Sequence, residues 1–306
     1  MQKHEGGKAD GRFGKTRHHK PESRRSGAVL IGLRSRKHIA PFELVRPESI
    51  AACMSCLADG KRCALMAGGL DLIDRMKSGE VFYTVISLSG IPELRGVSAA
   101  GNTITVGALT THAALSRDPL ILQKLPDLSK LWQKIANPRI RHTGTIGGNL
   151  MSCLPHYDAM PALLALGATA TIASASDGIR EVALDELPVG QALLVNIVIP
   201  TSDARLVTDR SLHPSVAVYA GATITSGKVT ALRVAIGGAF ARAQVVTLPA
   251  QDMPQASLGV QAAAFAQIIV GALPEPLTDG FASAGYRRRM IDVLTRRVLV
   301  RLGHSL

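Results

Sequence analysis

The chain has 306 residues, of which 46% are hydrophobic and 19% are charged, so it has the length and apolar content to fold as one or two domains. Four cysteines are too few for a disulfide framework, which favours a reducing, cytoplasmic location. Aromatic residues make up only 4% of the chain, which argues against a base-stacking nucleic-acid surface.

The net charge of +12 is concentrated at the N-terminus, where residues 1–38 hold eleven Lys or Arg and three Asp or Glu. We predict a basic, disordered extension there, because blocks of like charge rarely fold. A nucleic-acid or membrane-surface arm is the alternative. The uncharged stretch 258–273 is shorter than the roughly 20 residues that a membrane-spanning helix needs. We therefore expect no nucleic-acid partner and no membrane span.

Apolar periodicity predicts helices and strands from about residue 42 onward. Gly101-Asn102 and Ser226-Gly227 indicate hairpin turns, and residues 201–214 are predicted to be a connector. The strands and later helices after this connector indicate a separate C-terminal α+β domain. The predicted helices are 47–58, one from 72, one from 112, 128–136, 161–166, 257–272 and 284–302; the predicted strands are 63–67, 85–88, 103–108, 169–173, 193–199, 216–225 and 229–236.

Two glycine-rich segments stand out as candidate binding loops. Gly68-Gly69 lies between a predicted strand and a predicted helix, and Gly144 to Asn149 contains Gly147-Gly148. Glycines let the backbone approach a ligand closely, and consecutive N–H groups in such turns can bind an anion. Two such loops could hold the two phosphates of a dinucleotide. Each could equally be an ordinary tight turn. The chain lacks the Gly-x-Gly-x-x-Gly and Walker lysine motifs, so neither of those binding modes is expected.

The second segment and its surroundings resemble a known family. The strings Ile140-Arg-His-Thr-Gly-Thr-Ile-Gly-Gly-Asn-Leu150 and Asp158-Ala-Met-Pro-Ala-Leu-Leu-Ala-Leu-Gly-Ala168 are similar to the FAD-binding medium subunit of the molybdenum hydroxylases. This family includes xanthine dehydrogenase and the molybdenum-type carbon-monoxide dehydrogenase. Further similar segments occur in the family's order, and the resemblance covers roughly residues 40–302. These segments are Phe42 to Pro47, Ala67 to Leu72, Val106 to His112 and Tyr286 to Arg288.

The resemblance implies an α+β fold with FAD as cofactor. It implies a two-subdomain FAD-binding domain of the vanillyl-alcohol-oxidase and cell-wall-reductase type over residues 39–209, divided near residue 93. It implies a C-terminal α+β domain of the carbon-monoxide dehydrogenase flavoprotein type over residues 210–306.

The family's cofactor-binding roles carry over to positions in both loops and near them. The glycine loops would bind the pyrophosphate, and Asp158 would bind a polar group of FAD, although an acid at a helix start is also favoured by the helix dipole. Thr111 would lie close to FAD or simply cap a helix, and Leu194 would line the flavin ring or belong to the core. The full set is Leu65, Met66, Ala67, Gly68, Gly69, Leu70, Asp71, Leu72, Thr111, Thr143, Gly144, Thr145, Ile146, Gly147, Gly148, Asn149, Asp158 and Leu194.

No catalytic side chain and no metal site is expected in this chain. Cys53, Cys56 and Cys63 could suggest a metal or iron–sulfur site, but the first two lie in a predicted apolar helix, which favours inert buried thiols. His112, His142 and His156 lack the spacing of a zinc site. The redox chemistry would belong to the flavin, and the protein would bind and orient it.

The function implied is that of an oxidoreductase: the FAD-carrying electron-transfer subunit of a molybdenum hydroxylase complex. A small [2Fe–2S] subunit would deliver electrons from a large molybdopterin-containing subunit, and an external acceptor would receive them. The alternative is a stand-alone FAD-dependent oxidoreductase of the same fold. Replacing Gly147 or Gly148 by valine is expected to prevent FAD retention, because a branched side chain would block the turn and the approach of a phosphate.

Overall fold

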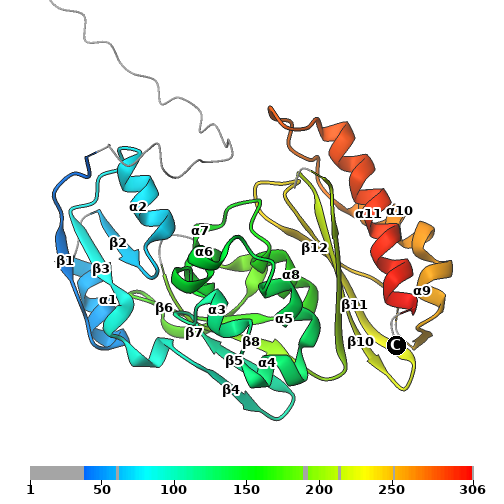
Figure 1. The fold of residues 1–306 in the computed structure, drawn as a ribbon, viewed down its shortest axis with the longest axis horizontal. Coiled ribbons are helices and arrows are strands. Elements are labelled where there is room, and N and C mark those ends of the chain that lie inside the picture. Colours follow the sequence, from blue (N-terminus) through cyan, green and yellow to red (C-terminus); the bar gives the residue numbers. More distant parts are fainter. Residues whose placement is uncertain (1–37, 60–61, 189–191, 213–214, 251, 305–306) are drawn as a thin grey trace, which may run out of the picture. The chain divides into compact units, whose positions relative to one another are not determined.

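The computed structural model describes residues 38–306 except 60–61, 189–191, 213–214, 251 and 305–306 (Figure 1). The predicted basic extension lies outside the described residues, apart from His38. The described part contains three β-sheets, each with its own helices, in the order of the chain. None of the described helices combines the length and the apolar character that crossing a bilayer requires.

The first sheet is parallel, with the strand order β1-β3-β2. Parallel neighbours need crossover connections, and the two helices of this segment supply them. Successive residues of β3 face opposite sides: Val85 packs with Met76 of the second helix, and Ile86 packs with Cys53 of the first. The elements are β1 (Glu43–Val45), α1 (Ile50–Asp59), β2 (Cys63–Met66), α2 (Leu70–Lys77) and β3 (Thr84–Ser87).

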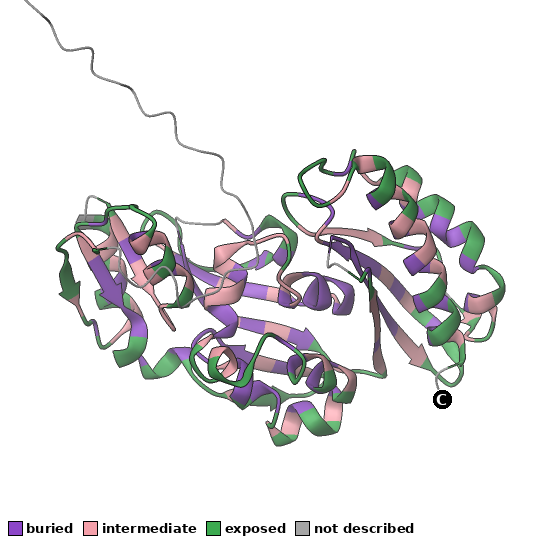
Figure 2. Cartoon of the chain, turned by 45° about the horizontal axis from the view of Figure 1, so that its top comes forward, coloured by how far each residue is buried: buried purple, intermediate pink, exposed green. Residues whose placement is uncertain are grey.

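The second sheet is antiparallel, with the order β4-β5-β8-β6-β7. Its first hairpin turns at Gly101-Asn102, as the sequence predicts. Six helices lie in the chain between β5 and β6, and the last of them, α8, is buried at every residue except the partly buried Met160 (Figure 2). The strands are β4 (Val97–Ala100), β5 (Thr103–Gly107), β6 (Thr169–Ser174), β7 (Gly178–Ala183) and β8 (Leu193–Pro200); the helices are α3 (His112–Leu115), α4 (Pro119–Lys124), α5 (Pro126–Trp132), α6 (Pro138–Thr143), α7 (Ile146–Ser152) and α8 (Ala159–Leu166).

The third sheet is antiparallel, with the order β12-β11-β10-β9 and with β13 beside β11. Strand β10 separates two cores: Val218 and Ala220 pack with the C-terminal helices, while Ala217 and Tyr219 belong to the core that contains α8. The elements are β9 (Ala204–Arg210), β10 (Ala217–Thr225), β11 (Lys228–Gly237), β12 (Gln244–Thr247), β13 (Met253–Pro254), α9 (Ser257–Val260), α10 (Ala262–Ala272) and α11 (Ala284–His304).

Helix α8 lies very close to β10. A Cβ atom added to Gly221 would be 2.1 Å from the carbonyl oxygen of Ala165, and one added to Gly237 would be 3.0 Å from Cγ of Pro161. Since these distances leave no room for side chains, the two glycines allow the third sheet to pack directly against α8.

Four predicted segments differ from the structure, and one of them is the helix predicted over 257–272, which is divided at Gln261 into α9 and α10. The predicted connector 201–214 contains β9, which pairs with β10 along seven positions. The helix predicted over 128–136 ends at Trp132, and Asn137-Pro138 begins α6 as well, because the Asn137 side chain accepts a hydrogen bond from the Ile140 N–H at 3.0 Å. The second glycine segment is the first turn of α7 instead of an open turn.

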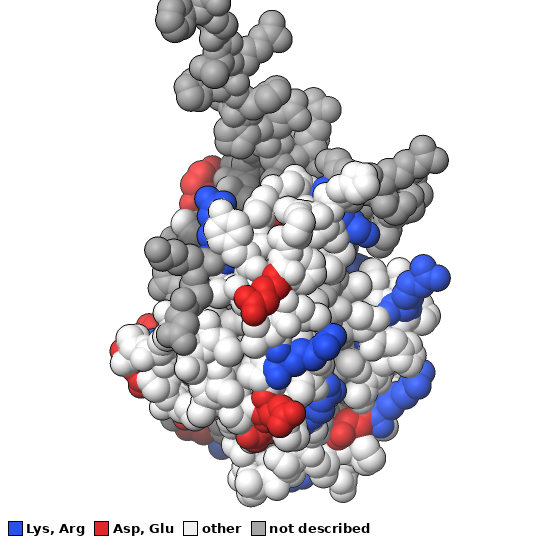
Figure 3. Space-filling view, turned by 90° about the vertical axis from the view of Figure 1, so that its left-hand side faces the viewer, with Lys and Arg blue, Asp and Glu red and all other residues white. Residues whose placement is uncertain are grey.

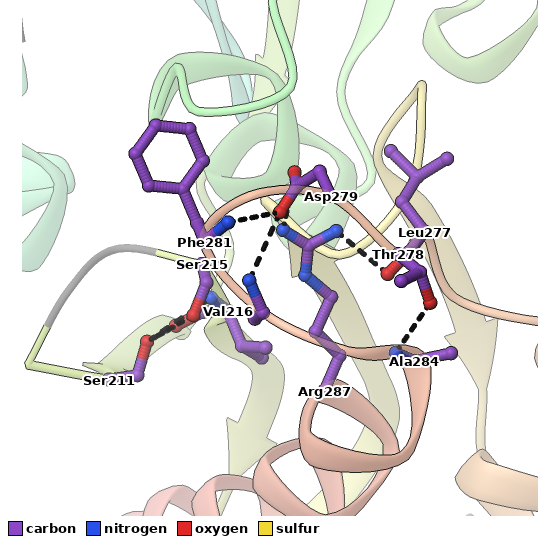
Figure 4. A network of polar contacts seen from close by, with 10 residues as sticks. Ser211, Ser215, Val216, Leu277, Thr278, Asp279, Phe281, Ala284 and Arg287 are labelled. Carbon is purple, nitrogen blue, oxygen red and sulfur yellow. Dashed lines mark hydrogen bonds and ion pairs between the residues drawn. The ribbon is translucent and has the colours of Figure 1, made fainter. Parts of the chain in front are cut away.

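A buried arginine fixes the loop before α11 (Figure 4). Arg287 is 2% exposed and donates hydrogen bonds to the Leu277 carbonyl oxygen at 2.9 Å and to Asp279 Oδ2 at 2.8 Å. Asp279 also accepts from the N–H groups of Phe281 and Ala282. One charged pair therefore organises the whole turn that leads into α11.

We expect Asp279→Asn to lower the free energy of unfolding at pH 7 by about 1 kcal/mol, the value of a hydrogen bond to a charged group discounted for exposure. The hydrogen bond from Arg287 is the largest cause that lowers the pKa of Asp279 below its ordinary 3.8. Because the pKa is lowered in the folded state, the stabilisation is fully present above 3.8 and is lost as the pH falls through the lowered value. Urea unfolding at pH 7 and pH 3 gives the free energy of unfolding of the variant and of the wild type. If these two free energies differed by the same amount at both pH values, the expectation would be contradicted.

Candidate functional site

The first glycine loop presents the free end of a helix. Gly69 precedes α2 with a φ of 78°, a left-handed conformation that favours glycine, and it gives the helix no side-chain cap. The first hydrogen bond of α2 runs from the Ile73 N–H to the Gly69 carbonyl oxygen. The N–H groups of the first turn, Leu70 to Leu72, have no acceptor among the described residues and remain available to a ligand.

The second glycine loop is already hydrogen-bonded to the protein. The N–H groups of Ile146 and Gly147 donate to the carbonyl oxygens of Thr110 at 3.0 Å and Ala108 at 2.8 Å. The N–H of Gly148 donates to Oγ1 of Thr145 at 3.1 Å, which caps α7. The expectation that both loops offer consecutive free N–H groups is therefore corrected for the second loop, where the carbonyl oxygens that follow β5 and the Thr145 cap accept their hydrogen bonds.

The two loops touch each other although they are more than 70 residues apart in the chain. A Cβ atom added to Gly68 would lie 2.0 Å from the carbonyl oxygen of Thr143, and one added to Gly148 would lie 3.7 Å from Cβ of Ala67. The Leu70 side chain reaches to 3.4 Å from a Cβ position at Gly144. The absence of a side chain at Gly68 is thus the condition for this contact.

Thr111 and His112 support the second loop. Thr111 forms an isolated antiparallel bridge with Thr145 and caps α3 by accepting a hydrogen bond from the Ala114 N–H at 3.2 Å. His112 lies under Gly144, with Cδ2 3.1 Å from a Cβ position there. Burial, followed by the charge of Arg141, lowers the pKa of His112 to about 4. The imidazole is therefore neutral at pH 7, and its buried Nδ1 has no hydrogen-bond partner among the described residues.

Asn149 of α7 and Asp158 before α8 each lack a hydrogen-bond partner that such a residue usually has. Oδ1 of Asn149 is buried and accepts no hydrogen bond, and Asn149 lines a pocket with Tyr157, Pro161 and Arg242. Asp158 occupies the N-cap position of α8, but its side chain makes no cap hydrogen bond. These are acceptors that a bound molecule carrying hydroxyl or amino groups could satisfy.

The remaining predicted residues divide between the loops and the core. Leu65 and Met66 are half-buried in β2, which ends at the first loop, and Asp71 in α2 lies 3.8 Å from Arg75. Leu72, Ile146 and Leu194 are between 1% and 6% exposed and belong to hydrophobic cores. For Leu194 this placement favours the core role over contact with a flavin ring.

The cysteines form no metal-binding group in the described chain. All four are free, and burial, then the neighbouring Cys56, raises the pKa of the Cys53 thiol to about 11. Within residues 38–306, apart from the gaps in the description, no three His, Cys, Asp or Glu side chains come together as metal ligands.

On the face that carries the first sheet, Lys and Arg side chains are interspersed with Asp and Glu side chains (Figure 3).

Sequence reasoning missed one residue of this region, Tyr219 on β10. Its hydroxyl donates a hydrogen bond to Oδ1 of Asp158. Burial, followed by the charge of Asp158, raises the pKa of Tyr219 well above its ordinary 10.0, so the phenol stays protonated. The one available signal was a tyrosine among small residues in Ala217-Val-Tyr-Ala-Gly221, and it does not identify a partner 61 residues away.

Comparisons with known proteins identify the family of the chain. Residues 40–202 match the family described as the FAD binding domain in molybdopterin dehydrogenase. The chain is 31% identical to the 6-hydroxypseudooxynicotine dehydrogenase complex subunit alpha of Paenarthrobacter nicotinovorans, over 86% of this chain and 95% of the relative. It is 30% identical to the carbon monoxide dehydrogenase medium chain of Afipia carboxidovorans, over 85% and 96% of the two chains.

Solved structures show the same similarity. A chain of the reconstituted CO dehydrogenase from Oligotropha carboxidovorans superposes with a TM-score of 0.75 at 26% identity, over 88% of this chain and all of that one. A chain of quinoline 2-oxidoreductase from Pseudomonas putida 86 superposes with a TM-score of 0.74 at 25% identity, over 87% of this chain and 98% of that one. The resemblance seen in the sequence is therefore confirmed: this chain belongs to the family of FAD-binding medium subunits of the molybdenum hydroxylases and is an oxidoreductase subunit with FAD as its cofactor.

Proposed function

We propose that this chain carries the FAD through which a molybdenum hydroxylase complex passes electrons from a small [2Fe–2S] subunit to an external acceptor, with a large molybdopterin-containing subunit oxidising the substrate. The observation that carries the proposal is the contact between Gly68 and Thr143 at the open end of α2, within the segment that matches the family. FAD, when bound, supplies the redox chemistry.

The residues present fit a dinucleotide. The free first-turn N–H groups of α2 suit the pyrophosphate, since a helix N-terminus favours negative charge. Asp71 is the one acid in that turn, and it lies 3.8 Å from Arg75, whose two hydrogen bonds go to Glu80. The unpartnered Oδ1 of Asn149 and the Asp158 carboxylate suit the donor groups of FAD, which carries several hydroxyls and an adenine amino group.

We also propose that the first two sheets are the two subdomains of a vanillyl-alcohol-oxidase-type FAD fold, meeting near residue 93. The third sheet with α9, α10 and α11 would be the C-terminal domain. Because β9 pairs with β10, we place the start of this domain at Ala204 instead of residue 210. The second glycine loop would hold the two subdomains together beside the pyrophosphate, with Thr111 as part of that support.

The test is to purify the chain, reconstitute it with FAD and follow the flavin absorbance, first alone and then with the large and small subunits. We expect stoichiometric FAD, no substrate-dependent flavin bleaching by the chain alone, and bleaching once both partners are added. Bleaching by substrate without partners would favour the stand-alone oxidoreductase. A preparation that takes up no flavin would overturn both functions.

A further inference from the structure

The Asp158 carboxylate is held in an unusual way for a residue at the start of a helix. Acids at this position commonly accept hydrogen bonds from the first-turn N–H groups, but Asp158 has a helical backbone conformation, with φ −77° and ψ −23°, and its side chain makes no such bond. Instead, Oδ1 accepts the hydrogen bond from the Tyr219 hydroxyl. Oδ2 accepts no hydrogen bond from the described residues, and it is not among the buried atoms that lack a partner.

Tyr219 is rigidly placed. It is 2% exposed in the centre of β10, where it lies opposite Ala235 on one side and Thr208 on the other. Its Cε2 is 3.7 Å from a Cβ position at Gly237, which is also 3.0 Å from Cγ of Pro161. The ring is thus confined beside the first turn of α8. A rigid donor of this kind selects one rotamer of the carboxylate that it binds.

We infer that Tyr219 is a positioning residue for FAD: its hydroxyl holds Oδ1 of Asp158 so that Oδ2 points away from the helix and accepts a donor group of the cofactor. This inference rests on the proposed function. Tyr219 belongs to the third sheet, which lies beyond the family match at residues 40–202. A residue outside the matched segment would therefore affect how tightly FAD binds.

Two physical effects support this role. The hydrogen bond from a fixed phenol selects one orientation of the Asp158 carboxylate. It also removes the rotational freedom of the side chain before FAD arrives, so less conformational entropy is lost on binding. Because the pKa of Tyr219 is raised by burial, the phenol remains a donor throughout the neutral pH range.

The experiment is a double-mutant cycle on apoprotein titrated with FAD, using Tyr219→Phe, Asp158→Ala and the double variant. Flavin fluorescence gives the Kd, and urea unfolding of each apoprotein gives its stability. We expect Tyr219→Phe to raise the Kd for FAD about tenfold, which corresponds to about 1.4 kcal/mol. In the Asp158→Ala background the same change is expected to leave the Kd unaltered, since the carboxylate through which Tyr219 acts is gone.

Tyr286→Phe is the matched control, because it removes the same hydroxyl from a residue of α11 that is 46% exposed; we expect the wild-type Kd. If Tyr219→Phe fails to fold, Asp158→Asn is the deciding variant. Asparagine keeps an oxygen that accepts from the phenol, but it can place an N–H donor where Oδ2 stood. We therefore expect unchanged apoprotein stability and weaker FAD binding. If wild type binds FAD but Tyr219→Phe binds equally well, or weakens binding equally in both backgrounds, Tyr219 only packs and the inference is overturned. A wild type that binds no FAD overturns the proposed function itself.

Discussion

A protein in which Gly68 is replaced by alanine is expected to purify without flavin. The added Cβ would lie 2.0 Å from the Thr143 carbonyl oxygen and 3.0 Å from its carbon, and both are backbone atoms that cannot rotate away. The two glycine loops must therefore separate. Separation moves the open end of α2 away from the second loop, so we expect the loss of FAD together with a destabilisation of about 1–3 kcal/mol or more, as for other overpacked sites.

Gly271→Ala is the matched control, since nothing lies within 4 Å of a Cβ there and the residue is exposed in α10. We expect it to retain flavin and to gain about 0.5–1 kcal/mol, because alanine favours a helix over glycine. The flavin-to-protein absorbance ratio and urea unfolding of both variants provide the measurement. Full flavin occupancy in the Gly68→Ala protein would mean that the contact between the loops is unnecessary for binding.

The regular elements could be predicted where the apolar pattern was strong. The β10–β11 hairpin, α8 and α11 follow from apolar residues at strand or helix spacing and from the turn at Ser226-Gly227. Strand β9 was missed because its sequence, Ala-Arg-Leu-Val-Thr-Asp-Arg, is charged and only partly buried on the edge of its sheet. Its pairing with β10 is a tertiary effect that no local pattern reveals.

The candidate site could be predicted in its components but not in its hydrogen bonds. The sequence identified both glycine loops, yet it could not show that Thr110 and Ala108, in the segment after β5, accept the hydrogen bonds of Ile146 and Gly147. It likewise placed Asp158 at a helix start without indicating that its partner is Tyr219, which comes from another sheet. Residue types indicate which groups can bind a ligand, whereas the long-range packing decides which of them remain unoccupied.

Replacing Gly147 and Gly148 in turn is expected to separate a folding effect from a binding effect. A Cβ on Gly147 would lie 2.8 Å from both Cβ and the carbonyl oxygen of Ala108, the same oxygen that accepts the Gly147 N–H. Gly147→Val should therefore destabilise the apoprotein by about 1–3 kcal/mol and lose flavin as a consequence. The reason is packing against Ala108, just after β5, whereas the sequence suggested a blocked turn and a blocked approach of the phosphate.

Gly148 is half-exposed, and a Cβ there would have Oγ1 of Thr145 at 3.1 Å and Cβ of Ala67 at 3.7 Å as its nearest neighbours. Gly148→Ala should thus change apoprotein stability by less than about 1 kcal/mol, because the gain in helix propensity offsets the close contact with Thr145. The new methyl group lies between the loops, so we expect a weaker Kd for FAD. Urea unfolding of the apoprotein and titration with FAD measure the two effects separately. If Gly148→Ala bound FAD as tightly as wild type, the cofactor would not lie against this part of α7, and the second loop would serve the fold alone.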